Sequence, residues 1–113
     1  MHHAIFWNLF LSLTQLRKDR ISPILLIMPS PLGYFTDKDY KTFLDHINSI
    51  SLATSVSVIR ADNLDKSFLE DTTNFADHIH MTQKGSIIFS RLLGSKLNIL
   101  FNELSLKLNS PPI

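Results

Sequence analysis

A short apolar run between two prolines does most to limit the folds open to this chain. Ile24 to Met28 are five consecutive apolar residues, with Pro23 before them and Pro29 after them. A run of this length with such boundaries predicts a β-strand buried on both faces of a parallel sheet. Residues 55–60, which include two valines and an isoleucine, predict a second strand. We therefore expect a parallel sheet as the framework.

Helical periodicity surrounds these two strands. Apolar residues at helical spacing predict a helix over about residues 3–20 that ends in a basic turn. The pattern predicts a second helix from Thr36 or Asp37 to about Leu52. A sheet whose strands are joined through helices in this way is typical of an α/β fold with right-handed crossovers.

The C-terminal third has a polar stretch followed by a long amphipathic segment. Residues 64–69 predict at most one short helical turn, and Thr82 is the expected N-cap of the last helix. The apolar face of that helix is predicted to comprise Ile87, Ile88, Leu92, Leu93, Leu97 and Leu100. The loop between the second strand and this helix therefore follows a strand end, where sites in parallel sheets usually lie.

Composition excludes several classes of protein. The 113 residues are at most one domain, and 11 basic against 10 acidic residues leave a net charge of +1. Scattered Lys and Arg residues argue against nucleic acid as a partner. The apolar run over residues 5–13 is too short for a transmembrane segment and lacks a basic region before it. The absence of Cys excludes disulfides and thiolate chemistry and leaves the compartment open.

An Asp and a His three residues apart stand just before the last predicted helix. A His that acts as a general base needs a carboxylate on its second ring nitrogen, and Asp77 can reach His80 within one turn. Chance alone gives roughly 0.35 such pairs in a chain of this composition. Requiring a Gly five residues later, as at Gly85, lowers that expectation to about 0.01. The extended pattern is therefore moderately specific.

The Asp77-x-x-His80 motif with Gly85, preceded by the Ile24–Met28 strand and Pro29, resembles the C-terminal half of an SGNH (GDSL-type) hydrolase. This resemblance implies a flavodoxin-like three-layer α/β/α sheet, of which residues 1–113 are one partial domain. It also implies a serine ester hydrolase or acyltransferase that acts on an ester or acyl substrate without a cofactor or metal. In such an enzyme His80 is the general base and Asp77 its orienting acid.

The nucleophile and oxyanion motifs of that family are missing from the chain. None of its three glycines is followed by Asp-Ser or by x-Asn-Asp. Ser30 follows a predicted strand end, but its flanking prolines favour a role in shaping the loop. Asn8 is best interpreted as an amide on a helix surface. Because acyl transfer needs the assembled unit, we expect a fragment that is inactive without an upstream segment.

Four other interpretations of these residues are open. Asp77, His78 and His80 have the side chains of metal ligands, although His46 makes an unconvincing further ligand. Asp77 can instead cap its own loop or the last helix, with His80 bonded to backbone. Tyr34 and Phe35 are either packing residues or the wall of an acyl pocket. A non-catalytic α/β module would bind a partner through an open sheet edge.

Overall fold

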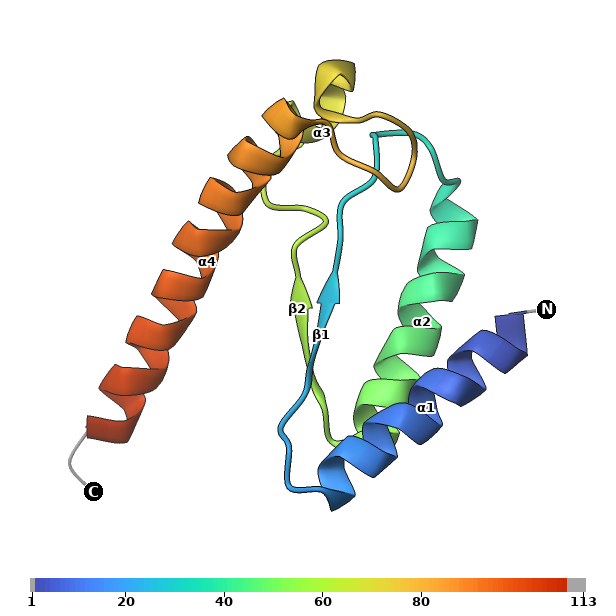
Figure 1. The fold of residues 1–113 in the computed structure, drawn as a ribbon, viewed down its shortest axis with the longest axis vertical. Coiled ribbons are helices and arrows are strands. Elements are labelled where there is room, and N and C mark those ends of the chain that lie inside the picture. Colours follow the sequence, from blue (N-terminus) through green and yellow to red (C-terminus); the bar gives the residue numbers. More distant parts are fainter. Residues whose placement is uncertain (1, 110–113) are drawn as a thin grey trace. The chain divides into compact units, whose positions relative to one another are not determined.

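The computed structural model describes residues 2–109, with side chains described from residue 5 to residue 106. Helices and a two-stranded parallel sheet form two compact units, so the chain belongs to the mixed α/β class (Figure 1). The first unit holds residues 33–60 and the residues up to position 28. The second holds residues 29–32 and the chain from position 61 onward.

The two predicted strands pair in parallel in the first unit. β1 (Ile24–Ile27) and β2 (Ser57–Arg60) run side by side, with Ile24 opposite Ser57 and Ile27 opposite Arg60. Each strand is one or two residues shorter than its apolar run. The prediction of a parallel pair joined through a helix is confirmed.

Burial alternates along β1. Leu25 and Ile27 point toward the helices of this unit, whereas Ile24 and Leu26 are 55% and 38% exposed. The prediction that both faces of this strand are buried is therefore wrong for the described residues. The reason is that the helices of the first unit pack on one face of a two-stranded sheet, and a continuous apolar run does not reveal how many layers surround it.

Local sequence sets the ends of the two helices of this unit. α1 (His2–Lys18) ends in a reversal in which Ile21 N–H donates to Leu16 O at 2.9 Å, with Arg20 at a φ of 62°. This pattern terminates helices with a left-handed residue, a place usually taken by glycine. α2 (Asp37–Thr54) is capped by Thr36, whose hydroxyl accepts the Asp39 N–H at 3.1 Å.

The core of the first unit is small and lies between its helices and sheet. Leu13 of α1, Ile50 of α2 and Val56 before β2 are buried together, and Leu9 and Leu25 pack against them. Aromatic rings extend this contact, since Phe6 stacks on His46 with ring centroids 4.7 Å apart. Of the apolar residues whose spacing predicted this helix, Leu9 and Leu13 face the core, whereas Ile5 is 63% exposed.

The second unit consists mainly of short elements and one long helix. Asp65 is the N-cap of α3 (Lys66–Glu70), and Asp71 is the N-cap of the 3₁₀ helix η1 (Thr72–Asn74). α4 (Gln83–Asn109) follows and continues through Gly94 without interruption. The expected short turn at residues 64–69 is confirmed as α3, shifted by one or two residues.

Four buried residues form the core of this unit. Phe68 lies against Phe75 and Phe89, with ring centroids 5.4 Å and 6.2 Å apart, and Ala61 completes the cluster. Phe89 is the contribution of α4, so the helix is held by its N-terminal half. The residues between η1 and α4 form a loop that carries Asp77 and His80.

Candidate functional site

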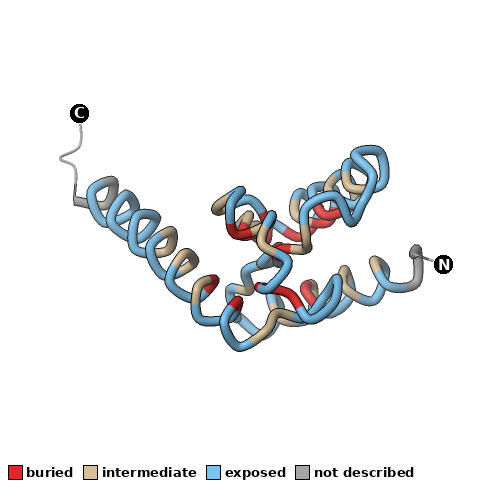
Figure 2. The backbone as a smooth tube through the Cα atoms, turned by 90° about the horizontal axis from the view of Figure 1, so that it is seen from above, coloured by how far each residue is buried: buried red, intermediate tan, exposed pale blue. Residues whose placement is uncertain are grey.

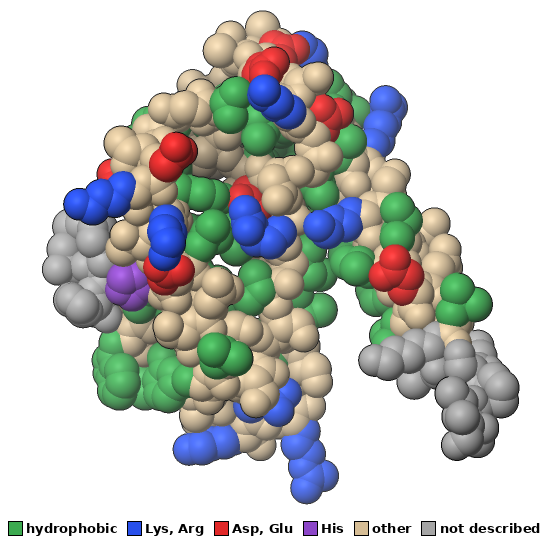
Figure 3. Space-filling model, turned by 180° about the vertical axis from the view of Figure 1, so that it is seen from behind, with side chains coloured by type: hydrophobic (Ala, Val, Ile, Leu, Met, Phe, Trp, Pro, Cys, Tyr) green, Lys and Arg blue, Asp and Glu red, His purple; other side chains and the backbone are tan. Residues whose placement is uncertain are grey.

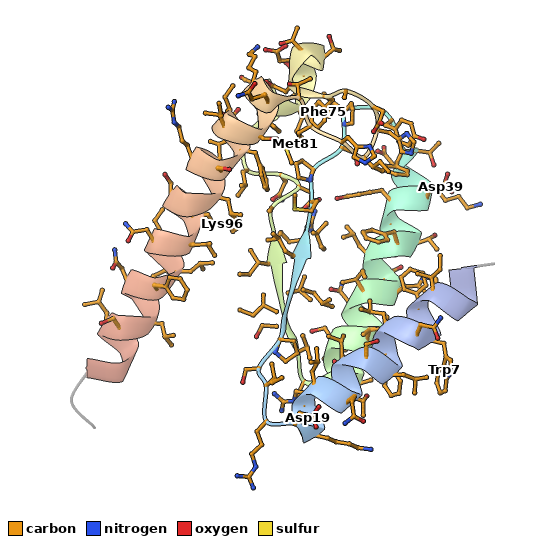
Figure 4. The ribbon with its side chains drawn as sticks, in the orientation of Figure 1. Trp7, Asp19, Asp39, Phe75, Met81 and Lys96 are labelled. Atoms are coloured by element: carbon orange, nitrogen blue, oxygen red, sulfur yellow. The ribbon has the colours of Figure 1, made fainter. Side chains whose placement is uncertain are left out.

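The loop over residues 75–81 carries both predicted catalytic residues. Its ends, Phe75 and Met81, form an antiparallel bridge, and both side chains belong to or pack on the core cluster (Figure 4). The Ala76 N–H donates to His80 O at 2.8 Å. Residues 76–80 are exposed between these ends. The loop is therefore anchored at its base and open to solvent at its tip.

The Asp77 carboxylate organises the loop from within. Its Oδ1 accepts the backbone N–H of Ile79 at 2.9 Å and that of His80 at 2.8 Å. Short Asp side chains commonly bond to backbone donors two or three residues ahead in this way. The interpretation that Asp77 caps its own loop thus matches part of what the carboxylate does.

The same carboxylate also holds the imidazole of His80. Nδ1 lies 2.9 Å from Oδ1 and 2.8 Å from Oδ2 of Asp77. The histidine therefore bonds to a carboxylate through its side chain, rather than to backbone. Nε2 has no protein partner among the side chains of residues 5–106, and the His80 side chain is 67% exposed. The second ring nitrogen is thus free to meet a substrate.

Hydrogen bonds from neighbouring groups stabilise the ionised form of the Asp77 carboxylate. Hydrogen bonds from the Ile79 N–H and from the His80 side chain lower the pKa of Asp77 to about 2. The carboxylate is therefore ionised at any ordinary pH. An ionised partner on Nδ1 selects the neutral tautomer that carries its proton there, which leaves the lone pair on Nε2. This arrangement has the geometry of an oriented general base.

The other predicted site residues do not join this pair. Ser30 is half-buried after β1, and no hydrogen bond among the described residues links it to His80. Asn8 is exposed on α1, as expected of a surface amide. Tyr34 and Phe35 pack edge to face on one another, with centroids 4.7 Å apart. Both rings are about half exposed, and a role in an acyl pocket stays a prediction.

The metal interpretation of the histidines gains no geometric support. Within the part of the chain that the structure describes, no three His, Asp or Glu side chains come together as a group able to hold a metal ion. His46 bonds through Nδ1 to Thr42 O at 2.8 Å within α2. The described residues therefore offer Asp77 and His80 as a pair and not as part of a larger ligand set.

Sequence reasoning missed the residues at the base of the loop. Lys84 donates from Nζ to Asp71 Oδ2 at 2.8 Å and to Thr73 Oγ1 at 2.6 Å. Asn74 is 2% exposed and donates from Nδ2 to Phe68 O at 3.0 Å. Residues 71–74 are an Asp, two Thr and an Asn, a composition typical of capped turns. This was the sequence signal that could have indicated the base of the loop.

The surface and the comparisons add little to the site. On the face drawn in Figure 3, basic and acidic side chains are interspersed and do not gather into one patch. None of the described helices combines the length and the apolar character that crossing a membrane requires. Searches against protein-family models, curated proteins and solved structures found no match to this chain.

Proposed function

We propose that this chain supplies the general base and its orienting acid to a serine-type ester hydrolase or acyltransferase of the SGNH kind. The observation that carries the proposal is the His80 ring, held at Nδ1 by the Asp77 carboxylate in a side chain that is 67% exposed. A base for acyl transfer needs this division of its two nitrogens, one for the carboxylate and one for the nucleophile.

The fold is compatible with this role. The parallel β1–β2 pair, with α1 and α2 packed on one of its faces, would be part of a flavodoxin-like three-layer sheet. Asp77 and His80 follow β2 in the sequence, and the segments that follow the strands of such sheets usually carry their site residues. Since the 113 residues contain no Gly-Asp-Ser, the nucleophile and oxyanion donors would come from residues outside this sequence.

The test begins with the DNA upstream of Met1. We expect a reading frame that encodes a Gly-Asp-Ser block and a Gly-x-Asn segment, and the protein completed with it should hydrolyse an activated ester such as p-nitrophenyl acetate. In that protein, His80→Ala and Asp77→Asn should each lower kcat by about 10⁴-fold. His78→Ala, two residues away in the same loop, is the matched control and should keep its rate.

Two outcomes contradict the proposal. One is full activity in His80→Ala or Asp77→Asn, and the other is the absence of any nucleophile block in the upstream frames.

A second function is favoured by one observation, the edges of the small sheet. Each strand pairs with only one neighbour among the described residues. In β1 and directly after it, the side chains of Ile24, Leu26 and Met28 are exposed. Open strands of this kind recruit other strands. A non-catalytic module would therefore fold and self-associate as the 113-residue chain alone. Sedimentation of that chain distinguishes a stable oligomer from a monomer that needs completion.

A further inference from the structure

The first turn of α4 is tied to η1 by several polar contacts. The Thr82 N–H donates to Asn74 O at 3.0 Å, and the Thr82 hydroxyl donates to Thr73 O at 2.7 Å. Lys84 adds its contacts to Asp71 and Thr73. These residues lie on either side of the 75–81 loop in sequence. We call the three α4-side residues Thr82, Lys84 and Gly85 the loop clamp.

Gly85 permits this close approach. A Cβ atom at position 85 would lie 2.0 Å from Asn74 O, far inside any contact that real side chains make. The atom it would meet is backbone and cannot swing away. Any other residue would therefore push the start of α4 away from η1. The Gly85 N–H also donates to the Thr82 hydroxyl at 3.1 Å, which makes Thr82 the N-cap of α4 as expected.

The clamp controls both ends of a short loop. Asp77 and His80 lie between Phe75 and Met81, and residues 76–80 are exposed. An exposed loop has little packing of its own to fix its backbone, so its conformation depends on its anchored ends. The bond from Thr82 to Asn74 continues the pairing that starts with the Phe75–Met81 bridge.

We infer that Thr82, Lys84 and Gly85 are positioning residues for His80. By fixing the base of the loop, they keep the backbone N–H groups of Ile79 and His80 on the Asp77 carboxylate and the His80 Nδ1 within its reach. The inference rests on the proposed function in one respect, since a positioned imidazole matters only where His80 acts as a base. The clamp acts through the loop, because its contacts across the loop are with Asp71, Thr73 and Asn74 at the base of that loop.

The carboxylate that Lys84 contacts stays charged down to low pH. Hydrogen bonds from Lys84 and then from Thr73 lower the pKa of Asp71 to about 2. Asp71 is therefore an ionised acceptor for the Lys84 side chain at neutral pH.

The tautomer of His80 is the direct readout of positioning. In the ¹⁵N-labelled full chain at about pH 9, where histidine is neutral, long-range ¹H–¹⁵N spectra report the ratio of the Nδ1–H to the Nε2–H form. Thr82→Val and Gly85→Ala should lower this ratio by roughly tenfold. This is the change expected when His80 Nδ1 loses its hydrogen bond to the charged Asp77 carboxylate. Lys84→Met should lower it by a smaller factor.

Matched variants separate positioning from simple loss of stability. Thr82→Ser keeps the hydroxyl and should keep the wild-type ratio. Gly94→Ala is the control for Gly85→Ala, because nothing lies within 4 Å of a Cβ built at Gly94 in the same helix. Lys96→Met, on the same helix, is the control for Lys84→Met.

An unchanged tautomer ratio in folded Gly85→Ala overturns the inference. If Gly85→Ala does not fold, equal ratios in Thr82→Val and Thr82→Ser overturn it instead. The measurement needs no substrate, so it stands apart from the proposed function. A completed protein without esterase activity would contradict the hydrolase and leave the tautomer result unaffected.

Discussion

The two ends of α4 show how differently one helix can be stabilised along its length. At its start, Gly85 is buried against Asn74 and Phe89 is 5% exposed in the core cluster. In the part nearer the C-terminus, Phe101 is 62% exposed and Leu106 is 72% exposed (Figure 2). Apolar residues recur along the whole helix, but those that belong to or pack on the core cluster, Ile88, Phe89, Leu92 and Leu93, lie in its first half.

An apolar pattern along a helix thus indicates a capacity for burial and not burial itself. The start of α4 is fixed by tertiary contacts that also hold the 75–81 loop. Backbone hydrogen bonds and helix propensity are weak sources of stability beside such contacts. Substitutions at the two ends should therefore have unequal effects, and the following predictions measure that inequality.

The largest effect is expected at the core contact of α4. Phe89→Ala removes a buried ring that touches Phe68, and we expect the free energy of unfolding to fall by roughly 3–5 kcal/mol. Phe101→Ala, the same substitution in the exposed half, should change it by no more than about 0.5 kcal/mol. Urea unfolding of the two variants measures both values. Equal losses would contradict the contrast between the two ends.

Smaller changes in the free energy of unfolding are expected at the two glycines of the helix, and they should have opposite signs. Gly85→Ala forces a backbone shift against Asn74 and should cost about 1–3 kcal/mol of unfolding free energy. Gly94→Ala places a methyl group in open space and should stabilise the helix by about 0.4–1 kcal/mol. Thermal unfolding should lower Tm in the first variant and raise it in the second. A rise in Tm for both variants would show that the Asn74 backbone can move aside for a methyl group at little cost in stability.

Acid should weaken the start of α4 more than its other end. The folded-state pKa values of Asp71 and Asp77 are about 2, below the value near 3.9 of an unfolded Asp. Their stabilising contribution is therefore complete above about pH 4 and is lost as the pH falls toward 2. Amide exchange between pH 4.5 and pH 2 should show falling protection factors in the first turn of α4, with residues 96–106 as the internal comparison.

Lys84→Met sharpens this acid prediction. Because the Lys84 hydrogen bond is the largest cause of the low pKa of Asp71, its removal should raise that pKa toward the ordinary range. Loss of protection should then begin at a higher pH, whereas Lys96→Met should behave as the unaltered chain does. No change in the onset would mean that Thr73 alone holds the carboxylate.

Much of the secondary structure could be predicted from the sequence because its signals are local. Thr36 and Thr82 were expected N-caps, and both accept the N–H three residues ahead. The apolar run at residues 24–28 predicted a strand in a parallel pair. It could not predict which face is covered, because that depends on the number of layers and not on the strand itself.

The candidate site was predictable to the same extent. Asp77 and His80 are three residues apart, so their contact needs only one turn and a carboxylate within reach. The clamp joins residues that are farther apart in sequence, since Lys84 and Asp71 are separated by 13 positions. No periodicity or cap signature links such residues. A glycine at position 85 was expected to let the first turn of the helix pack closely on neighbouring backbone, but which backbone it meets, the carbonyl of Asn74, required the structure.

The most direct test of this account is the tautomer of His80 in the unaltered chain and in Asp77→Asn. Neutral His80 should carry its proton mainly on Nδ1, and Asp77→Asn should shift the proton toward Nε2 by removing the charged acceptor. Long-range ¹H–¹⁵N spectra of the full chain at about pH 9 give both ratios. A wild-type ratio that already favours Nε2–H, and that Asp77→Asn leaves unchanged, would contradict the claim that Asp77 orients His80 as a base.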